Sequence, residues 1–211
     1  EHGLQQNEII NTKVQGYNLV TEFSRTEHKL GGTAIYCKDN LTNNIEAIEI
    51  NHFCEELLFE AAMAYVKVKG KQIYVLGVYR PPGGNTRSGL NILSHILDHT
   101  QAHNKSFLLL GDINIDSLKK YSPDNLMLED ELTTHNMRRL PLPATRVTAE
   151  TRSSIDCVST NIPEVEVIAG ILQTGLSDHA AQFCSLNFNQ EISTTLNLKR
   201  QMGKNNLENL K

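Results

Sequence analysis

The chain lacks several features that would assign it to a particular class of protein. No run approaches the ~20 apolar residues that a membrane-spanning helix needs. The amino terminus lacks the charged and then apolar segment of a secretory signal. There is also no internal repeat and no low-complexity block. We therefore expect a soluble, intracellular protein that does not enter a membrane.

Cysteine is scarce and is not arranged in CxxC pairs. Cys157 and Cys184 lie inside apolar runs, where a thiol behaves as a small hydrophobic group. We expect the cysteines to be buried free thiols, since zinc or disulfides would require pairs of them to meet in space. The four cysteines are Cys37, Cys54, Cys157 and Cys184.

An excess of basic residues is also missing, since the formal net charge is −4. This argues against a protein held on nucleic acid by its bulk charge. A nuclease remains compatible with this charge, because a bound cation would neutralise several acidic groups and only a local basic rim need meet phosphates. The rim candidates lie in or beside predicted loops, where arginines are more often simply solvated: Arg80, Arg87, Arg138, Arg139, Arg146 and Arg152.

The composition is that of one globular domain, with 211 residues of which 39% are apolar and 21% charged. Short apolar runs separated by Asn, Gly and Asp predict strands, and one run with helical spacing predicts a longer helix. Together they indicate a layered α/β sandwich. We expect a domain over residues 1–189 and a polar linker or tail over 190–211. The predicted strands are 17–23, 32–37, 46–50, 59–68, 72–79, 107–110, 153–160, 165–169 and 179–188, and the predicted helices are 87–103 and 124–136.

Three short polar motifs border these apolar runs: Gly-Asp-Ile-Asn at 111–114, Ser-Ser-Ile-Asp at 153–156 and Ser-Asp-His at 177–179. Polar residues at the ends of neighbouring strands can converge at one end of a rigid sheet. Asp, Asn and His are the groups that metal-assisted attack on a phosphate requires. Asp156 lies inside an apolar strand and therefore needs a partner. An aspartate bonded to His179 would fix the tautomer of the imidazole and raise the pKa of His179. The motifs therefore predict a phosphodiester-cleaving site.

Each motif also has a plainer interpretation. Gly, Asp and Asn are common wherever a chain turns, and a lone histidine is usually a satisfied core residue. The histidines at 95, 99 and 103 share one face of the predicted helix, but no glutamate occupies the position that a zinc protease needs. We therefore expect those three to form a solvent-exposed stripe.

Four segments, in this order and spacing, resemble the endonuclease/exonuclease/phosphatase superfamily: Gly-Val-Tyr-Arg-Pro-Pro at 77–82, Gly-Asp-Ile-Asn-Ile-Asp at 111–116, Ser-Ser-Ile-Asp at 153–156 and Leu-Ser-Asp-His at 176–179. The chain looks most similar to the apurinic-type endonuclease domain of non-LTR (LINE-type) retrotransposons, over residues 1–188. The resemblance implies a DNase I-like, four-layer sandwich of two mainly antiparallel β-sheets flanked by helices. It also implies a Mg²⁺- or Mn²⁺-dependent nuclease.

The resemblance assigns roles to the matching residues. Asp112 would orient or deprotonate the attacking water, Asn114 would hold the scissile phosphate, and Tyr79 would contact a phosphate oxygen. Asp156 would pair with His179, whose charged imidazole stabilises the phosphate or transfers a proton.

Further roles concern the metal and the substrate. Asp178 would assist at the metal or on the leaving-group side, and Glu1, in the segment Glu-His-Gly-Leu, would be the main metal ligand. The family places an asparagine-bearing strand ahead of this glutamate, so we expect the chain to be truncated at its amino terminus. The expected substrate-binding residues are Thr145, Ser177, Arg80 and Arg146.

The function implied by this resemblance is that of a DNA endonuclease domain that nicks one strand. The resulting 3′ hydroxyl would prime reverse transcription. The expected partners are DNA and a reverse transcriptase domain located carboxyl-terminal to this chain, and the expected location is the nucleus. Two alternatives are a phosphatase or phospholipase of the same superfamily and a catalytically inactive fragment that binds DNA or protein.

Overall fold

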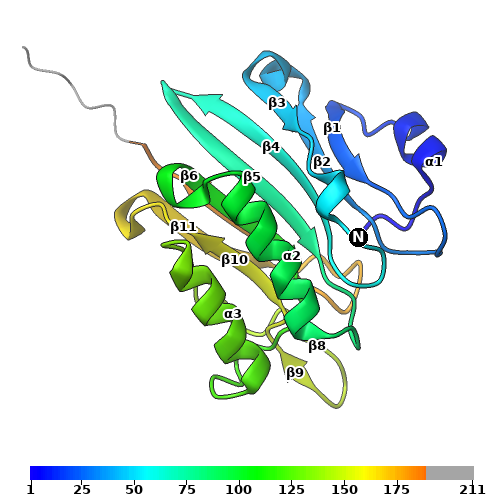
Figure 1. The fold of residues 1–211 in the computed structure, drawn as a ribbon. Coiled ribbons are helices and arrows are strands. Elements are labelled where there is room, and N and C mark those ends of the chain that lie inside the picture. The colour runs from blue at the N-terminus through cyan, green and yellow to red at the C-terminus, as the bar shows by residue number, and fades with distance from the viewer. Residues whose placement is uncertain (189–211) are drawn as a thin grey trace, which may run out of the picture.

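The computed structural model describes residues 1–188, and the predicted tail at 190–211 lies outside the described residues. The helices and strands follow one another along the chain as Figure 1 shows. The α-helices are α1 (Gln6–Asn11), α2 (Thr86–His99) and α3 (Pro123–Thr134). The strands are β1 (Tyr17–Phe23), β2 (Thr33–Lys38), β3 (Ile45–Ile48), β4 (Glu60–Val68), β5 (Lys71–Tyr79), β6 (Ser106–Asp112), β7 (Arg138–Arg139), β8 (Arg146–Val147), β9 (Arg152–Ser153), β10 (Asp156–Thr160), β11 (Val167–Leu172) and β12 (Ala181–Leu186).

The centre of the molecule is a six-stranded sheet with the order β3-β4-β5-β6-β10-β7. Neighbouring strands are antiparallel except for β5 and β6, which run parallel. A parallel pair needs a long crossover connection, and α2 supplies it. Helices α2 and α3 lie side by side over one face of this sheet (Figure 1).

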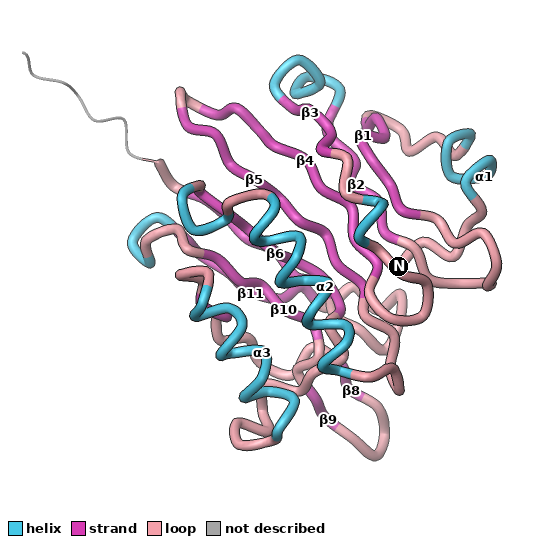
Figure 2. Tube along the Cα trace, viewed as in Figure 1, coloured by secondary structure: helices cyan, strands magenta, loops and turns pink. Residues whose placement is uncertain are grey.

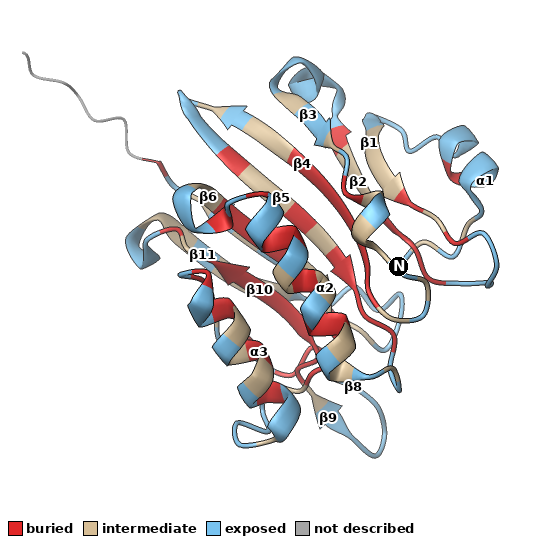
Figure 3. Cartoon of the chain, viewed as in Figure 1, coloured by how far each residue is buried: buried red, intermediate tan, exposed pale blue. Residues whose placement is uncertain are grey.

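Both faces of the central strands are buried, which explains why residues 107–110 read as an unbroken apolar run (Figure 3). Phe107 and Leu109 pack in the core beneath the helices, while Leu108 and Leu110 pack in a second core on the opposite face. The alternation follows the two-residue period of a strand. Asp112, two residues beyond Leu110, therefore projects from the face opposite the helices.

The face opposite the helices is covered by two hairpins. The hairpin β1–β2 contacts β4, and the hairpin β11–β12 contributes to the second core and contacts β10. Within residues 1–188 these hairpins are separate two-stranded sheets. Layers of sheet and helix around shared cores confirm the predicted α/β sandwich.

The predicted elements agree with the structure except at some ends and in short segments (Figure 2). Helix α2 ends at His99 rather than at residue 103, because Gln101 adopts a left-handed backbone conformation with φ of 52° before a separate 3₁₀ turn. The predicted strand 153–160 is divided into β9 and β10. Helix α1 and the two-residue strands β7 and β8 were not predicted, because each is too short to carry a periodic signal.

Two further predictions concern single residue types. All of the cysteines lie within the described residues and are free thiols, with Cys37 and Cys157 buried and the others partly buried. Histidines 95, 99 and 103 are exposed, as the stripe predicts. No helix in the described part of the chain is long and apolar enough to span a membrane.

Candidate active site

Three candidate residues lie in one row across neighbouring strands of the central sheet. Tyr79 of β5 is the registered partner of Asp112 of β6, and Asp112 is the registered partner of Asp156 of β10. Residues paired in register project from the same face of a sheet. The strand register therefore places a phenol and two carboxylates side by side at one end of the sheet.

His179 reaches this row from a separate segment. Its Nδ1 lies 3.1 Å from Oδ2 of Asp156. The segment is fixed beside β8, because the Ala180 N–H donates to the Thr145 carbonyl at 2.7 Å and the Val147 N–H donates to the Asp178 carbonyl at 3.1 Å. One side-chain donor atom from each of Asp112, Asp156 and His179 lies within 4.8 Å of the other two.

Asp112, Asp156 and His179 line a cavity of 680 Å³ on the face opposite the helices. Glu1 also lines it, and its Oε1 accepts a hydrogen bond from the Gly31 N–H at 2.8 Å. The structure thus places Glu1 near the two aspartates, although Glu1 does not belong to the compact carboxylate and imidazole group. The cavity is lined by Glu1, His2, Gly3, Leu30, Val78, Gly111, Asp112, Asp156, Ser177, Asp178, His179 and Gln182.

The electrostatics of the cavity favour a bound positive charge. Burial and, to a smaller extent, the nearby carboxylate of Asp156 raise the pKa of Asp112 to about 6, although the Asn114 N–H and His179 act in the opposite direction. Burial, followed by the carboxylate of Glu1, raises the pKa of Tyr79 to about 12. Carboxylate oxygens that repel one another are suitable donors for a hard divalent cation. The residues present therefore fit such a cation.

Asp156 is held in place by buried polar contacts. The Thr145 hydroxyl is only 1% exposed and accepts hydrogen bonds from the N–H groups of Ile155 and Asp156, both at 3.2 Å. Arg139 donates from Nη2 to the carbonyl of Asp156 at 3.1 Å. Thr145 was predicted to bind substrate, and the structure places it beneath the site instead. Arg139 was expected in the basic rim, and the structure has it partly buried and bonded to backbone carbonyls.

The predicted role of Arg80 in substrate binding is wrong. Its side chain is 3% exposed, and it donates from Nε to the Ile113 carbonyl at 2.8 Å and from Nη2 to the Asn114 carbonyl at 3.0 Å. Burial lowers the pKa of this guanidinium. Arg80 therefore fixes the loop that follows Asp112. It was expected at the surface because it follows a strand and precedes two prolines.

Asn114 and Asp178 lie at the edges of the cavity. Asn114 donates its N–H to Oδ1 of Asp112 at 2.9 Å and its side-chain amide to the Arg80 carbonyl at 2.8 Å, so its side chain lines a neighbouring cavity. The carboxylate of Asp178 accepts from Nε of Arg146 at 2.7 Å, which lowers the pKa of Asp178. Ser177 closes a local turn by accepting the His179 N–H at 3.1 Å.

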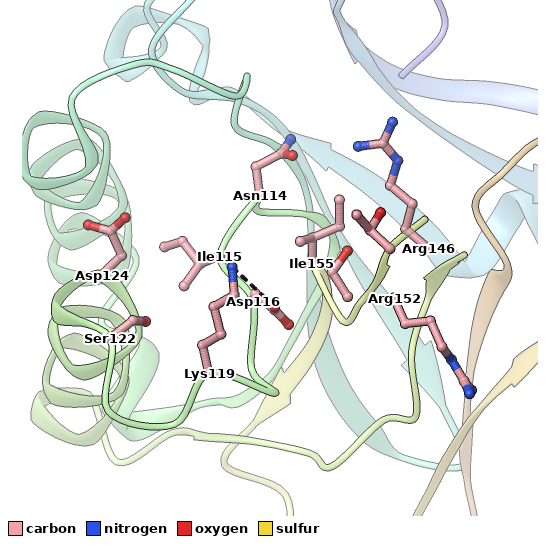
Figure 4. Close-up of a pocket in the computed structure, with 11 residues that line it drawn as sticks. Asn114, Ile115, Asp116, Lys119, Ser122, Asp124, Arg146, Arg152 and Ile155 are labelled. Atoms are coloured by element: carbon pink, nitrogen blue, oxygen red, sulfur yellow. Dashed lines mark ion pairs between the residues drawn. The ribbon is translucent and has the colours of Figure 1, made fainter. Parts of the chain in front are cut away.

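Arg146, which bonds to Asp178 at this edge, also lines the neighbouring cavity of 690 Å³ (Figure 4). Arg146 and Arg152, both from the β8–β9 hairpin, lie on one side of it, and Asp124 lies on the other. Lys119 contributes a third cationic group, and its Nζ lies 3.9 Å from Oδ2 of Asp116. Cationic side chains are thus available outside the acidic cavity.

Gly111 belongs to the Gly-Asp-Ile-Asn motif, but no role of its own was predicted for it. Its φ is 143°, and a Cβ at this position would overlap the carbonyl oxygen of Val78 in β5. A glycine is therefore required where β6 approaches β5, one residue ahead of Asp112. The signal was present, because a strand glycine often marks a close backbone approach.

Comparison with known proteins gives no match to a family model and none to a curated protein at the level of sequence. Solved structures do match. The endonuclease domain of TRAS1, a telomere-specific non-LTR retrotransposon, has a TM-score of 0.65 at 12% identity, covering 82% of this chain and 79% of that one. The AP endonuclease LMAP from Leishmania major has a TM-score of 0.63 at 14% identity, covering 88% and 76%.

A structure with a different activity in its name is also similar. The mannosyl-6-phosphatase Bt3783 from Bacteroides thetaiotaomicron has a TM-score of 0.55 at 12% identity, covering 83% of this chain and 78% of that one. At such identities the likeness concerns the fold. It confirms the resemblance predicted from the motifs: the chain has the DNase I-like fold of the endonuclease/exonuclease/phosphatase proteins.

Proposed function

We propose that this domain hydrolyses phosphodiester bonds of DNA with the help of Mg²⁺ or Mn²⁺, nicking one strand and leaving a 3′ hydroxyl. The observation that carries the proposal is the group formed by Asp112, Asp156 and His179, whose donor atoms lie within 4.8 Å of one another at the end of the central sheet. Acidic oxygens beside an imidazole are the groups that metal-assisted phosphate chemistry uses.

The roles follow from the contacts. Asp112, Asp156 and Glu1 would offer oxygen ligands, and a bound divalent cation would supply charge that stabilises the transferred phosphate. Asp112 would also orient or deprotonate the attacking water. Asp156 holds Nδ1 of His179, which leaves Nε2 free to contact a phosphate oxygen. Tyr79, next in the row, would donate its hydroxyl to the same phosphate.

A polymeric substrate is favoured over a phosphate monoester by the cations outside the acidic cavity. Arg146, which bonds to Asp178 of the acidic cavity, lines the second cavity together with Lys119 and Arg152. A nucleic-acid strand carries further phosphates on either side of the cleaved one, and local cations of this kind position such a backbone. A monoester has no second phosphate for them to bind.

A plasmid-nicking assay tests the proposal. Purified protein should convert supercoiled plasmid to the open circle with Mg²⁺ and not with EDTA. Asp112→Asn should abolish the conversion, and Asp130→Asn, an exposed aspartate on α3, should not. Turnover of mannose 6-phosphate without nicking would favour a phosphatase. Binding of DNA without cleavage in either metal would favour an inactive binding module.

We further propose that the nick serves retrotransposition, with a reverse transcriptase domain on the same polypeptide and the nucleus as the place of action. The similarity in fold to a domain of a non-LTR retrotransposon supports this proposal. The reading frame that follows the codon for Lys211 tests it. A reverse transcriptase sequence there would support the proposal, and an unrelated enzyme domain would contradict it.

A further inference from the structure

The row of registered residues continues beyond Tyr79 to a buried ion pair. Glu60, the first residue of β4, is the registered partner of Tyr79 and is fully buried. Nε of Arg25 donates to Oε1 of Glu60 at 2.6 Å, and Arg25 is 6% exposed. The guanidinium carbon of Arg25 lies 5.9 Å from the centre of the Tyr79 ring. The pair therefore lies next to Tyr79, which is itself the registered neighbour of Asp112.

The same pair holds the loop that contacts Glu1. The second carboxylate oxygen of Glu60 accepts from the Gly32 N–H at 2.6 Å, and Arg25 donates from Nη1 to the Lys29 carbonyl at 3.3 Å. Gly31 has φ of 78°, and a Cβ on it would overlap the Arg25 guanidinium. The glycines at 31 and 32 thus permit the backbone to lie directly against the ion pair.

From this loop the contacts reach the cavity. The Gly31 N–H donates to Oε1 of Glu1 at 2.8 Å, and the Gly31 carbonyl accepts from the Gly3 N–H at 2.8 Å. On the other side of the loop, a Cβ on Gly32 would overlap the ring of His2. An unbroken chain of contacts therefore joins Glu60 to the carboxylate of Glu1.

A buried ion pair is poorly explained by stability alone, because apolar residues of similar volume often stabilise a protein as well or better. We infer that Arg25 and Glu60 are positioning residues, which fix the carboxylate of Glu1 at the wall of the cavity through the Gly31–Gly32 loop and hold the ring of Tyr79 beside Asp112. The inference deepens the proposed function and rests on it, since it concerns how the same site binds its cation.

The test compares variants of the pair with a structural control. Arg25→Met/Glu60→Met removes both charges, so it leaves no buried charge unpaired, and circular dichroism identifies the temperatures at which it is folded. Glu60→Gln keeps the shape of the side chain and removes its charge. Arg138→Met is the control, because Arg138 also donates to buried carbonyls, those of Thr160 and Ile162, but lies away from the cavity.

The measurements are the Mn²⁺ affinity, from the electron paramagnetic resonance signal of the free ion, and the Mn²⁺ concentration for half-maximal nicking. In the double variant the affinity for Mn²⁺ should be about tenfold weaker, and the Mn²⁺ concentration for half-maximal nicking about tenfold higher. Arg138→Met should show wild-type values of both at temperatures where each protein is folded. Wild-type Mn²⁺ dependence in the folded double variant would overturn the inference.

If the wild type neither nicks DNA nor binds Mn²⁺, the proposed function fails, and the crystal structure of the double variant then decides the inference by itself. A displaced Gly31–Gly32 loop that no longer donates a hydrogen bond to Glu1 would support the positioning role. An unchanged loop that still donates this hydrogen bond would overturn it.

Discussion

Asp112 on β6 lies directly opposite Asp156 on β10 in the antiparallel ladder. Two carboxylates in register repel each other, and burial adds to the free energy needed to ionise Asp112. This arrangement opposes stability and has no packing benefit. It is the arrangement expected of a site whose charge is compensated by a bound cation.

Asp112→Asn is expected to stabilise the metal-free protein at high pH. The pKa of Asp112 rises from 3.8 to about 6 on folding, so the folded state binds the proton more tightly than the unfolded state does. The ionised carboxylate therefore destabilises the fold fully above pH 6, and this cost disappears below about pH 4.

Urea denaturation in EDTA measures the effect. At pH 8 the variant should be more stable by about 1–3 kcal/mol, and near pH 4 the two proteins should agree within about 0.5 kcal/mol. Saturating Mg²⁺ should reduce or reverse the difference at pH 8. A variant that is no more stable than the wild type at pH 8 would show that Asp112 is ionised without cost.

His179→Ala is expected to lower the nicking rate by about 100-fold or more, because loss of a positioned imidazole commonly costs that much. The side chain is 28% exposed and its ring contacts Asp156, so its removal should leave the fold intact by circular dichroism. His95→Ala, at an exposed position on α2, is the matched control. Equal losses of structure and activity would instead identify His179 as a core residue.

Thr145→Val is expected to destabilise the domain by about 1–3 kcal/mol, since it removes the acceptor of two buried N–H groups. Thr145→Ser keeps the hydroxyl and should cost less than about 1 kcal/mol, the order of one lost methyl group. Urea denaturation of both variants measures the difference. Equal effects would mean that the methyl group, and not the hydroxyl, matters at this position.

Gly111→Ala is expected to be severely destabilising, by more than about 3 kcal/mol, because the new Cβ would overlap the Val78 carbonyl and the backbone φ of 143° disfavours any side chain. Gly77→Ala in the adjacent strand is the control, since a Cβ there meets its nearest neighbours at 3.8 Å. Thermal unfolding of the two variants compares them. Similar melting temperatures would contradict the close approach of β5 and β6.

The central strands and the ends that carry Asp112 and Asp156 could be predicted from sequence. Apolar runs bordered by polar residues mark the ends of strands, and the cost of burying a carboxylate alone predicts that Asp156 has a cation or a histidine as its partner. The resemblance in motifs identified that partner as His179. The register that sets Asp112 opposite Asp156 could not be predicted, because it depends on which strands become neighbours.

The supporting residues were the least predictable part of the site. Arg25 and Glu60 are 35 residues apart, and neither lies in a motif. Glu60 at the head of an apolar strand did carry a signal of the kind used for Asp156, since a buried carboxylate needs a partner. Arg80 was misplaced because loop position alone does not show whether a guanidinium bonds to carbonyls or to solvent.

The central claim is that Asp112, Asp156 and Glu1 together hold a divalent cation. Anomalous diffraction from crystals soaked in Mn²⁺ tests it most directly. The account predicts an anomalous peak in the 680 Å³ cavity, in contact with the carboxylate of Asp112, and its loss in Asp112→Asn crystals. Occupancy elsewhere on the protein, with none beside Asp112, would contradict it.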